Sequence, residues 1–308
     1  MDFDGIDEVI LPVADADRVV AFYSDVLEFE VISSETYPDP QFADVWSLPS
    51  APRRTVLLGK RGSAGGWIRV AEVPELPPPS PAGRPDRSGG YAIDFYLRDP
   101  ETVEARAAEH YPSRGTPAEY DLPGHAGTLV HEGFFDQTDS GLAHATVGYR
   151  PRGTRCVLDS RDDLTVSEVV AVVFSSVQYD KAVAFVRDVL GGQPYLSEEF
   201  GGPEIERLLD LAPDERLPMT LFRGPERRNA RLEVCHARPP QARPDDTVPR
   251  VTATIQVDDL DRIAAALAGG EHGRSTGVVD VLQDGVLTRR VGIRTLHGLS
   301  FDLVQRGS

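Results

Sequence analysis

The feature that most constrains the fold is a phrase that occurs twice. Residues 21–29 read AFYSDVLEF and residues 184–192 read AFVRDVLGG, so that Phe22 and Phe185 stand 163 positions apart in a chain of 308 residues. Each phrase has apolar side chains at helical spacing and follows an apolar run that favours a β-strand. A repeat of about half the chain predicts that the fold consists of two similar halves.

Two further segments follow the same plan. YAIDFYLRDPETVEARAAEH at 91–110 and VTATIQVDDLDRIAAALAGG at 251–270 each begin with a strand pattern and continue into a helical one. Asp15, Asp99 and Asp259 stand where the helices begin and are expected to cap them. Alternating extended stretches come after each helix. We therefore expect an α+β protein of four β-α-β-β-β modules, at 1–75, 89–150, 164–237 and 249–306.

Length and linkers suggest how the modules are grouped. A chain of 308 residues is typical of two domains. Proline-rich joins lie inside each half, at 73–90 and 237–250, and an arginine-rich segment at 150–163 separates the halves. We expect an N-terminal domain at 1–150 and a C-terminal domain at 164–308, each made of two modules.

Composition and charge limit the partners. The formal net charge of −17 repels nucleic acid and anionic lipid, and no basic, apolar leader or long apolar run is present. The two cysteines, Cys156 and Cys235, have no spacing typical of a disulfide framework. The sequence therefore predicts a cytoplasmic monomer or homodimer with a small-molecule ligand and without nucleic acid or membrane partners.

These patterns carry a resemblance to a known family. With VADADRVVAFYSDVL after the first strand and HGLSFDLVQ at the last, the four modules resemble the vicinal oxygen chelate superfamily. That superfamily includes glyoxalase I, extradiol dioxygenases, fosfomycin-modifying enzymes and bleomycin-resistance proteins. The resemblance implies that modules pair into cupped, eight-stranded mixed sheets. We expect two such cups, with module one paired to module two and module three to module four.

The resemblance also implies where a metal would bind. Family members that use a divalent metal place a His, Gln or Glu in the first strand of a module and a Glu in its last strand. The first-strand positions correspond to Glu8, about Ala92, about Ala171 and about Thr252. In the last strands, the alternation of apolar neighbours turns Glu233 and Asp302 inward. Iron, zinc, nickel or manganese could use Glu8, Glu233 and Asp302, but the incomplete set predicts that no metal is bound tightly.

The same alternation turns Arg69 inward and yields two candidate sites. The N-terminal cup is expected to contain Glu8, Arg69, Asp94 and His144, and the C-terminal cup Glu233, Cys235, Thr252 and Asp302. The expected catalytic residues are Glu8, His144, Glu233 and Asp302. The expected ligand-binding residues are Trp67, Arg69, Asp94, Tyr96, Cys235 and Thr252. For the last strand of the second module, either His144 or Thr146 could face the cup.

Three functions remain open from the sequence. The first is a glyoxalase- or dioxygenase-like enzyme with a degenerate metal site, performing isomerase, lyase or oxygenase chemistry on a small oxygen-rich molecule. The alternative is a metal-free protein that binds or sequesters an antibiotic-like small molecule, with Trp67, Tyr96 and Tyr149 as apolar contacts. The third is a scaffold whose cups are filled by its own loops.

Overall fold

A computed structural model describes residues 3–79, 85–125, 127–150, 155–224, 230–237 and 248–306. The first module consists of β1 (Glu8–Val13), α1 (Ala16–Asp25), β2 (Glu30–Thr36), α2 (Phe42–Val45), β3 (Arg54–Gly59) and β4 (Trp67–Glu72). The second consists of β5 (Gly89–Leu97), α3 (Pro100–Ala108), β6 (Ala118–Asp121), β7 (Leu129–Gln137) and β8 (Leu142–Gly148). Both follow the predicted β-α-β-β-β order, and the first has one short additional helix.

The second half repeats this order. After a short turn of helix, η1 (Val157–Asp159), the third module consists of β9 (Val166–Ser176), α4 (Tyr179–Asp188), β10 (Gln193–Phe200), α5 (Pro203–Leu209), β11 (Leu217–Arg223) and β12 (Arg231–His236). The fourth consists of β13 (Thr252–Val257), α6 (Leu260–Leu267), β14 (Gly273–Ser275), β15 (Val279–Gln283), β16 (Val286–Thr295) and β17 (Ser300–Gln305). The predicted α+β class and the fourfold module are confirmed.

Local sequence explains where the helices begin. The carboxylates of Asp15, Asp99 and Asp259 accept hydrogen bonds from the backbone N–H groups of residues 17, 102 and 262, at 3.0, 3.2 and 2.9 Å. These side chains satisfy backbone donors that have no partner inside the helix. The three predicted caps are therefore present.

The two copies of the repeated phrase also end alike. Glu28 and Gly191 occupy the same place after α1 and α4, and both have a positive φ, +59° and +78°. Glycine adopts this conformation without strain, whereas a glutamate does so at some cost. The Glu28 carboxylate accepts hydrogen bonds from the backbone of Thr165 and Val166, at 3.0 and 3.3 Å, which helps to hold it there.

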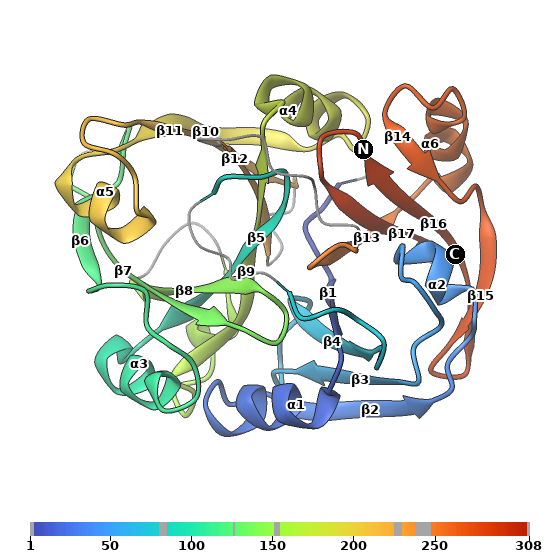
Figure 1. Ribbon diagram of the computed structural model, residues 1–308, viewed down its shortest axis with the longest axis horizontal. Coiled ribbons are helices and arrows are strands. Elements are labelled where there is room, and N and C mark those ends of the chain that lie inside the picture. Colours follow the sequence, from blue (N-terminus) through green and yellow to red (C-terminus); the bar gives the residue numbers. More distant parts are fainter. Residues whose placement is uncertain are drawn as a thin grey trace.

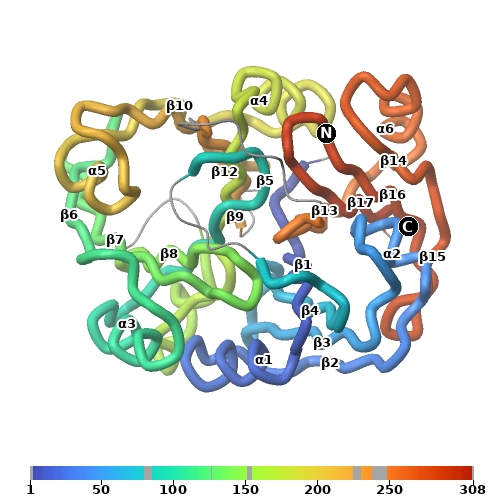
Figure 2. Tube along the Cα trace, viewed as in Figure 1, coloured from blue at the N-terminus to red at the C-terminus, as the bar shows by residue number. Residues whose placement is uncertain are grey.

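The modules do not pair as the sequence suggested. Sheet A has the order β14-β16-β17-β13-β1-β4-β3-β2, with β15 paired to β16, and combines modules one and four. Sheet B has the order β10-β11-β12-β9-β5-β8-β7-β6 and combines modules two and three. Figure 1 shows the two sheets side by side, and Figure 2 shows the blue N-terminal module next to the red C-terminal one. The predicted pairing of one with two and three with four is wrong.

The antiparallel contact between first strands creates this arrangement. Glu8 of β1 lies opposite Thr254 of β13, and Asp94 of β5 lies opposite Ala171 of β9. Because all four first strands have similar apolar patterns, their sequences do not determine which partner each selects. Consecutive modules meet through their helices instead. The ring of Phe22 on α1, for example, packs edge-on against Phe135 of β7, with 5.5 Å between centroids.

The core lies between the convex faces of the two sheets. One large cluster joins helix-facing side chains from all four modules, such as Val9, Phe95, Phe174 and Phe301. Each concave face has a smaller cluster of its own. We call the concave side of sheet A cup A and that of sheet B cup B. Parts of the three predicted joins, at 80–84, 151–154 and 238–247, lie outside the described residues. Within the described ranges, no helix has the length and apolar character needed to cross a bilayer.

Candidate functional site

The observed pairing redistributes the predicted site residues. Cup A receives Glu8, Arg69, Thr252 and Asp302, because β1, β4, β13 and β17 are neighbours in sheet A. Cup B receives Asp94, Tyr96, Glu233 and Cys235 from β5 and β12 of sheet B. Both predicted sets were therefore mixtures of the two cups. In particular, Glu233 and Asp302 belong to different sheets and cannot bind one ion together.

His144 does not face a cup. Its ring lies on the convex side of β8, where it stacks on Phe95 at 5.7 Å and packs beside Phe135 at 5.0 Å. The hydroxyl of Tyr23 lies 2.6 Å from Nε2 of His144. Burial lowers the pKa of His144 to about 3, so the ring is a neutral part of the core. The prediction that His144 is a catalytic residue in a cup is wrong, because Ala143 and Ala145 lie on the cup side instead.

Four other predicted residues have structural partners. The indole N–H of Trp67 donates to Ser63 at 3.1 Å, and the hydroxyl of Tyr149 donates to Asp159. The hydroxyl of Thr252 lies 2.9 Å from that of Ser300. Cys235 is fully buried in the cluster of cup B, and burial raises the pKa of its thiol.

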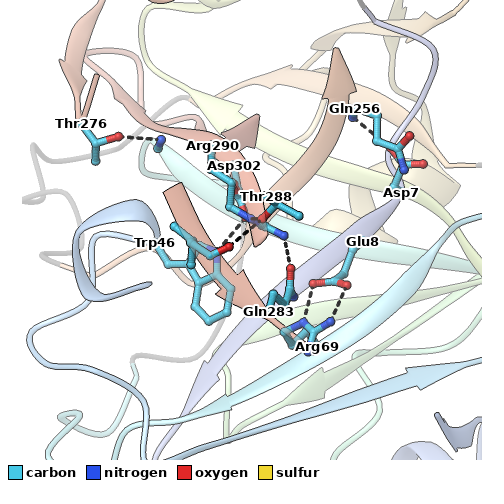
Figure 3. Close-up of polar contacts among 12 residues, drawn as sticks. Asp7, Glu8, Trp46, Arg69, Gln256, Thr276, Gln283, Thr288, Arg290 and Asp302 are labelled. Atoms are coloured by element: carbon cyan, nitrogen blue, oxygen red, sulfur yellow. Dashed lines mark hydrogen bonds and ion pairs between the residues drawn. The ribbon is translucent and has the colours of Figure 1, made fainter. Parts of the chain in front are cut away.

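Cup A is crossed by ion pairs between its inward side chains (Figure 3). Arg69 places Nε 2.7 Å and Nη2 3.1 Å from the two carboxylate oxygens of Glu8. Its Nη2 also lies 2.8 Å from Asp284. Arg290 forms a second pair with Asp302. Arg69 and Arg290 are almost completely buried, so each cation depends on its carboxylate partners for stabilisation.

A short helix fills the remaining space of cup A. Phe42 and Trp46, at the ends of α2, stack with 4.0 Å between ring centroids, and both are fully buried. The indole of Trp46 donates a hydrogen bond to Asp302 at 2.9 Å. At Gly292 of β16, a Cβ atom would overlap the backbone of Val45, so glycine is needed for this close approach. The centre of cup A, around Asp302, is therefore filled by its own chain, and a recess of about 470 Å³ remains on the other side of α2, against β14 and β16.

The residues present do not fit the metal site that the resemblance implies. In cup A, the carboxylates at the ligand positions, Glu8 and Asp302, are engaged by Arg69 and Arg290, and cations beside them disfavour a metal. In cup B, Glu233 pairs with Arg231 at 3.0 Å. Within the described part of the chain, no three His, Cys, Asp or Glu side chains gather in a way that could hold an ion.

Cup B contains a cavity of about 390 Å³. Apolar residues of β11 and α5, such as Leu221 and Ile205, form part of its wall. Its polar lining consists mainly of four tyrosines, three carboxylic acids and two arginines: Tyr91, Tyr96, Tyr120, Tyr195, Asp94, Glu132, Glu233, Arg223 and Arg231. A mainly apolar cavity with a few converging polar groups is typical of a small-molecule site.

Arg231 organises the polar part of this cavity. Its Nη1 donates to the hydroxyl of Tyr96 at 2.6 Å, and its Nε donates to Glu233 at 3.0 Å. Although burial opposes it, the nearby tyrosines and Glu233 raise the pKa of Arg231, which therefore remains a cation. On the opposite wall, the Tyr120 hydroxyl donates to Glu132. These contacts fix the orientation of five polar side chains around the cavity.

Asp94 differs from its neighbours because its contacts are incomplete. Its side chain lines the cavity, only 5% of the residue is exposed, and Oδ1 has no hydrogen-bond partner among the described residues. Burial, together with the charges of Glu233 and Glu132, raises the pKa of Asp94 well above its ordinary value. A buried carboxyl group with an unused oxygen at a cavity wall is suited to contact a ligand.

Sequence reasoning missed six of these polar cavity residues: Tyr91, Tyr120, Glu132, Tyr195, Arg223 and Arg231. Several of them had a usable signal. In RLEVC, the alternation that turns Glu233 inward also turns Arg231 inward, and in LVHEGFF it places Glu132 on the same face as Val130 and Phe134. In AEYD, Tyr120 alternates with Glu119 and Asp121, whereas Tyr195 had no signal because β10 shows no clear alternation.

Comparisons with known proteins agree with this fold. No family model matches the chain, and no curated protein matches its sequence. Among solved structures, glyoxalase I from Zea mays is similar with a TM-score of 0.62 and 10% identity, over 98% of this chain and 92% of that one. A candidate dioxygenase from Bacillus subtilis subsp. subtilis str. 168 is similar with a TM-score of 0.64 and 13% identity, over 100% and 86%. The chain therefore has a glyoxalase-like fold.

Proposed function

We propose that this protein binds a small organic molecule in cup B without the help of a tightly bound metal. The observation that carries the proposal is the difference between the cups: cup A is filled by α2, whereas cup B has a cavity of about 390 Å³ with inward polar groups. A cavity of this size matches ligands of roughly drug-like dimensions. The metal-free binding protein that the sequence left as an alternative is therefore the preferred function.

A binding measurement tests the proposal. Three indole probes with the same aromatic body serve as ligands: tryptamine, tryptophol and indole-3-acetate. We expect at least one of them to bind at millimolar concentration, as detected by saturation-transfer NMR. Met219 lines the cavity and is half-buried, so that Met219→Trp places an indole of the protein in the cavity and should abolish binding.

A matched control adds the same side chain elsewhere. Leu287, on β16 of sheet A, is 68% exposed, and Leu287→Trp should leave probe binding unchanged. The proposal fails if none of the three probes binds to the wild type. It also fails if Met219→Trp binds the probes as well as Leu287→Trp does, because the site would then lie outside cup B.

One observation favours a second candidate, an enzyme that moves protons. Asp94 is a buried carboxyl group with a raised pKa at the cavity wall, which are properties of a general acid or base. Indole-3-acetone, a ketone with exchangeable protons beside its carbonyl, tests this candidate. If the protein is an enzyme of this kind, the wild type should accelerate the exchange of these protons in deuterated water and the Asp94→Asn variant should not. If it only binds its ligand, neither protein should change the rate.

A further inference from the structure

We propose that cup B selects small organic cations: molecules with a flat apolar body and a protonated nitrogen that lies at the carboxylate of Asp94. This inference depends on the proposed function, because it names the ligand class of the same cavity. Its basis is the combination of an acidic lining, tyrosine rings and one buried carboxyl group with an unused oxygen.

The first step is the charge of the lining. Three carboxylic acids, Asp94, Glu132 and Glu233, face two arginines, Arg223 and Arg231, among the described lining residues. The acids outnumber the cations once Asp94 is ionised, and a cation bound beside Asp94 favours that ionised form. In a cavity of low dielectric constant, an added negative charge is disfavoured and an added positive charge is stabilised.

The second step is what the two arginines already contact. Arg231 is directed to Glu233 and Tyr96 by hydrogen bonds of 3.0 and 2.6 Å. The guanidinium of Arg223 lies over the ring of Tyr195, 4.8 Å from its centroid. Both cations thus have partners within the protein, and an anionic ligand would have to compete with those partners.

The third step is the position of Asp94. Asp94 is only 5% exposed, and its Oδ1 makes no hydrogen bond to any described residue. A buried polar atom without a partner destabilises the protein, and a donor on a ligand would remove that penalty. A protonated amine supplies such a donor together with a compensating charge.

The fourth step is the aromatic lining. Tyr96, Tyr120 and Tyr195 line the cavity from β5, from β6 and from β10. Tyrosine rings attract organic cations through the negative face of the ring, and they also provide flat apolar contact for the body of a ligand. Arg223 over Tyr195 and Arg231, 5.7 Å from the centroid of Tyr96, already use this interaction.

The fifth step concerns the molecule as a whole. The formal net charge of −17 gives the protein a field that attracts cations and repels anions. Long-range attraction raises the rate of encounter, whereas Asp94 and the tyrosines supply the selectivity inside the cavity. The two effects can be separated, because salt screens the long-range attraction far more than the contacts with Asp94 and the tyrosines inside the cavity.

The test compares the three indole probes by isothermal titration at one pH and ionic strength. Tryptamine carries a cation, tryptophol is neutral and indole-3-acetate carries an anion. We expect tryptamine to bind about tenfold more tightly than tryptophol, which corresponds to about 1.4 kcal/mol, and indole-3-acetate to bind most weakly. Asp94→Asn should bring the affinities of tryptamine and tryptophol to within about twofold of each other.

A control variant separates the local contact from the overall charge. Asp180 lies exposed in the first turn of α4, and Asp180→Asn removes the same charge without changing the cavity. This variant should keep the full preference for tryptamine. Circular dichroism verifies that both variants fold.

The possible results distinguish the two proposals. If tryptophol or indole-3-acetate binds as tightly as tryptamine, and Met219→Trp abolishes that binding, cup B is the site but the cation inference is overturned. A preference for tryptamine that survives in Asp94→Asn also overturns it. If no probe binds, both the ligand class and the proposed function fail.

Discussion

The two cups derive from the same module, yet they use their concave faces in opposite ways. In cup A every inward charge that the family would offer to a metal is neutralised by an arginine, and α2 fills the space above with Phe42 and Trp46. In cup B a short helix, α5, forms part of the wall of a cavity and leaves it open. The same module thus builds one cup whose centre is packed and ion-paired and another with an open cavity.

The largest expected difference concerns aromatic side chains. Trp46→Ala should lower the free energy of unfolding by about 3–5 kcal/mol, because it creates a cavity in the filled cup and removes the hydrogen bond to Asp302. Met219→Ala in cup B should lower it by only about 1 kcal/mol, because that side chain borders an existing cavity. Urea denaturation of the two variants measures both values. Equal losses would contradict the view that only cup A is packed.

The next prediction compares the same substitution in both cups. Asp302→Asn should destabilise the protein by about 3 kcal/mol, because it leaves the buried Arg290 without its anionic partner. Asp94→Asn should cause no loss, because among the described residues Asp94, unlike Asp302 with Arg290, has no ion-pair partner to be left unpaired. Thermal denaturation at pH 7 shows which of the two variants is less stable. A larger loss of stability for Asp94→Asn than for Asp302→Asn would reverse the roles assigned to the cups.

A smaller effect is expected in the pH dependence of stability. The pKa of Asp94 is raised above its ordinary value of 3.8 by burial and then by the charges of Glu233 and Glu132, while Arg231 opposes the shift. The other titratable groups that line the cavity are Tyr91, Tyr96, Tyr120, Tyr195, His125 and Arg223. The Asp94 carboxyl group therefore stays protonated to higher pH in the folded state than in the unfolded state. The protein loses stability as pH rises from about 4 through the raised pKa, because the folded state must then ionise a buried group.

The matching measurement is a pair of denaturation series between about pH 4 and pH 7. Relative to wild type, Asp94→Asn should gain stability steadily as pH rises, because it has no carboxyl group to ionise in the cavity. Asp302→Asn should gain in the same direction but less, because burial also raises the pKa of Asp302 while Arg290 and the hydrogen bond from Trp46 lower it. A constant difference between wild type and Asp94→Asn across this range would mean that the Asp94 carboxyl group is not perturbed.

The smallest expected effect is that of metal removal. Protein prepared without a histidine tag should contain far less than one ion of iron, zinc, nickel or manganese per chain after dialysis. A chelator should leave its melting temperature unchanged, since a metal bound only to the folded state would stabilise it. Stoichiometric metal that survives dialysis would contradict the donor analysis of both cups and would favour the enzyme over the binding protein.

Much of the fold followed from local sequence. Strand alternation, helical spacing and the caps at Asp15, Asp99 and Asp259 each depend on neighbours in the chain, and all were predicted. The pairing of modules was not, because it depends on a choice between four similar first strands. The choice of partner strand decides which residues share a cup. Glu233 and Asp302 were correctly predicted to point inward, but they were wrongly assigned to the same cup.

His144 illustrates a second limit of the sequence. Alternation identifies two faces of a strand, but it does not tell which is the cup when both are buried. Ala143, Ala145 and Val147 were taken as the helix-facing side because they are apolar, whereas they lie with the cluster of cup B. The polar His144 fits the convex side only because Tyr23 lies at hydrogen-bond distance from its ring, and the residues are 121 positions apart.

The most direct test of the contrast between the cups is a crystal structure of the protein soaked with tryptamine. We expect electron density for one indole in cup B, with its amine within hydrogen-bond distance of Asp94. Cup A should retain the stack of Phe42 on Trp46 and contain no ligand. Density for tryptamine in cup A, or a metal ion coordinated by Glu8 or Asp302 there, would contradict the account.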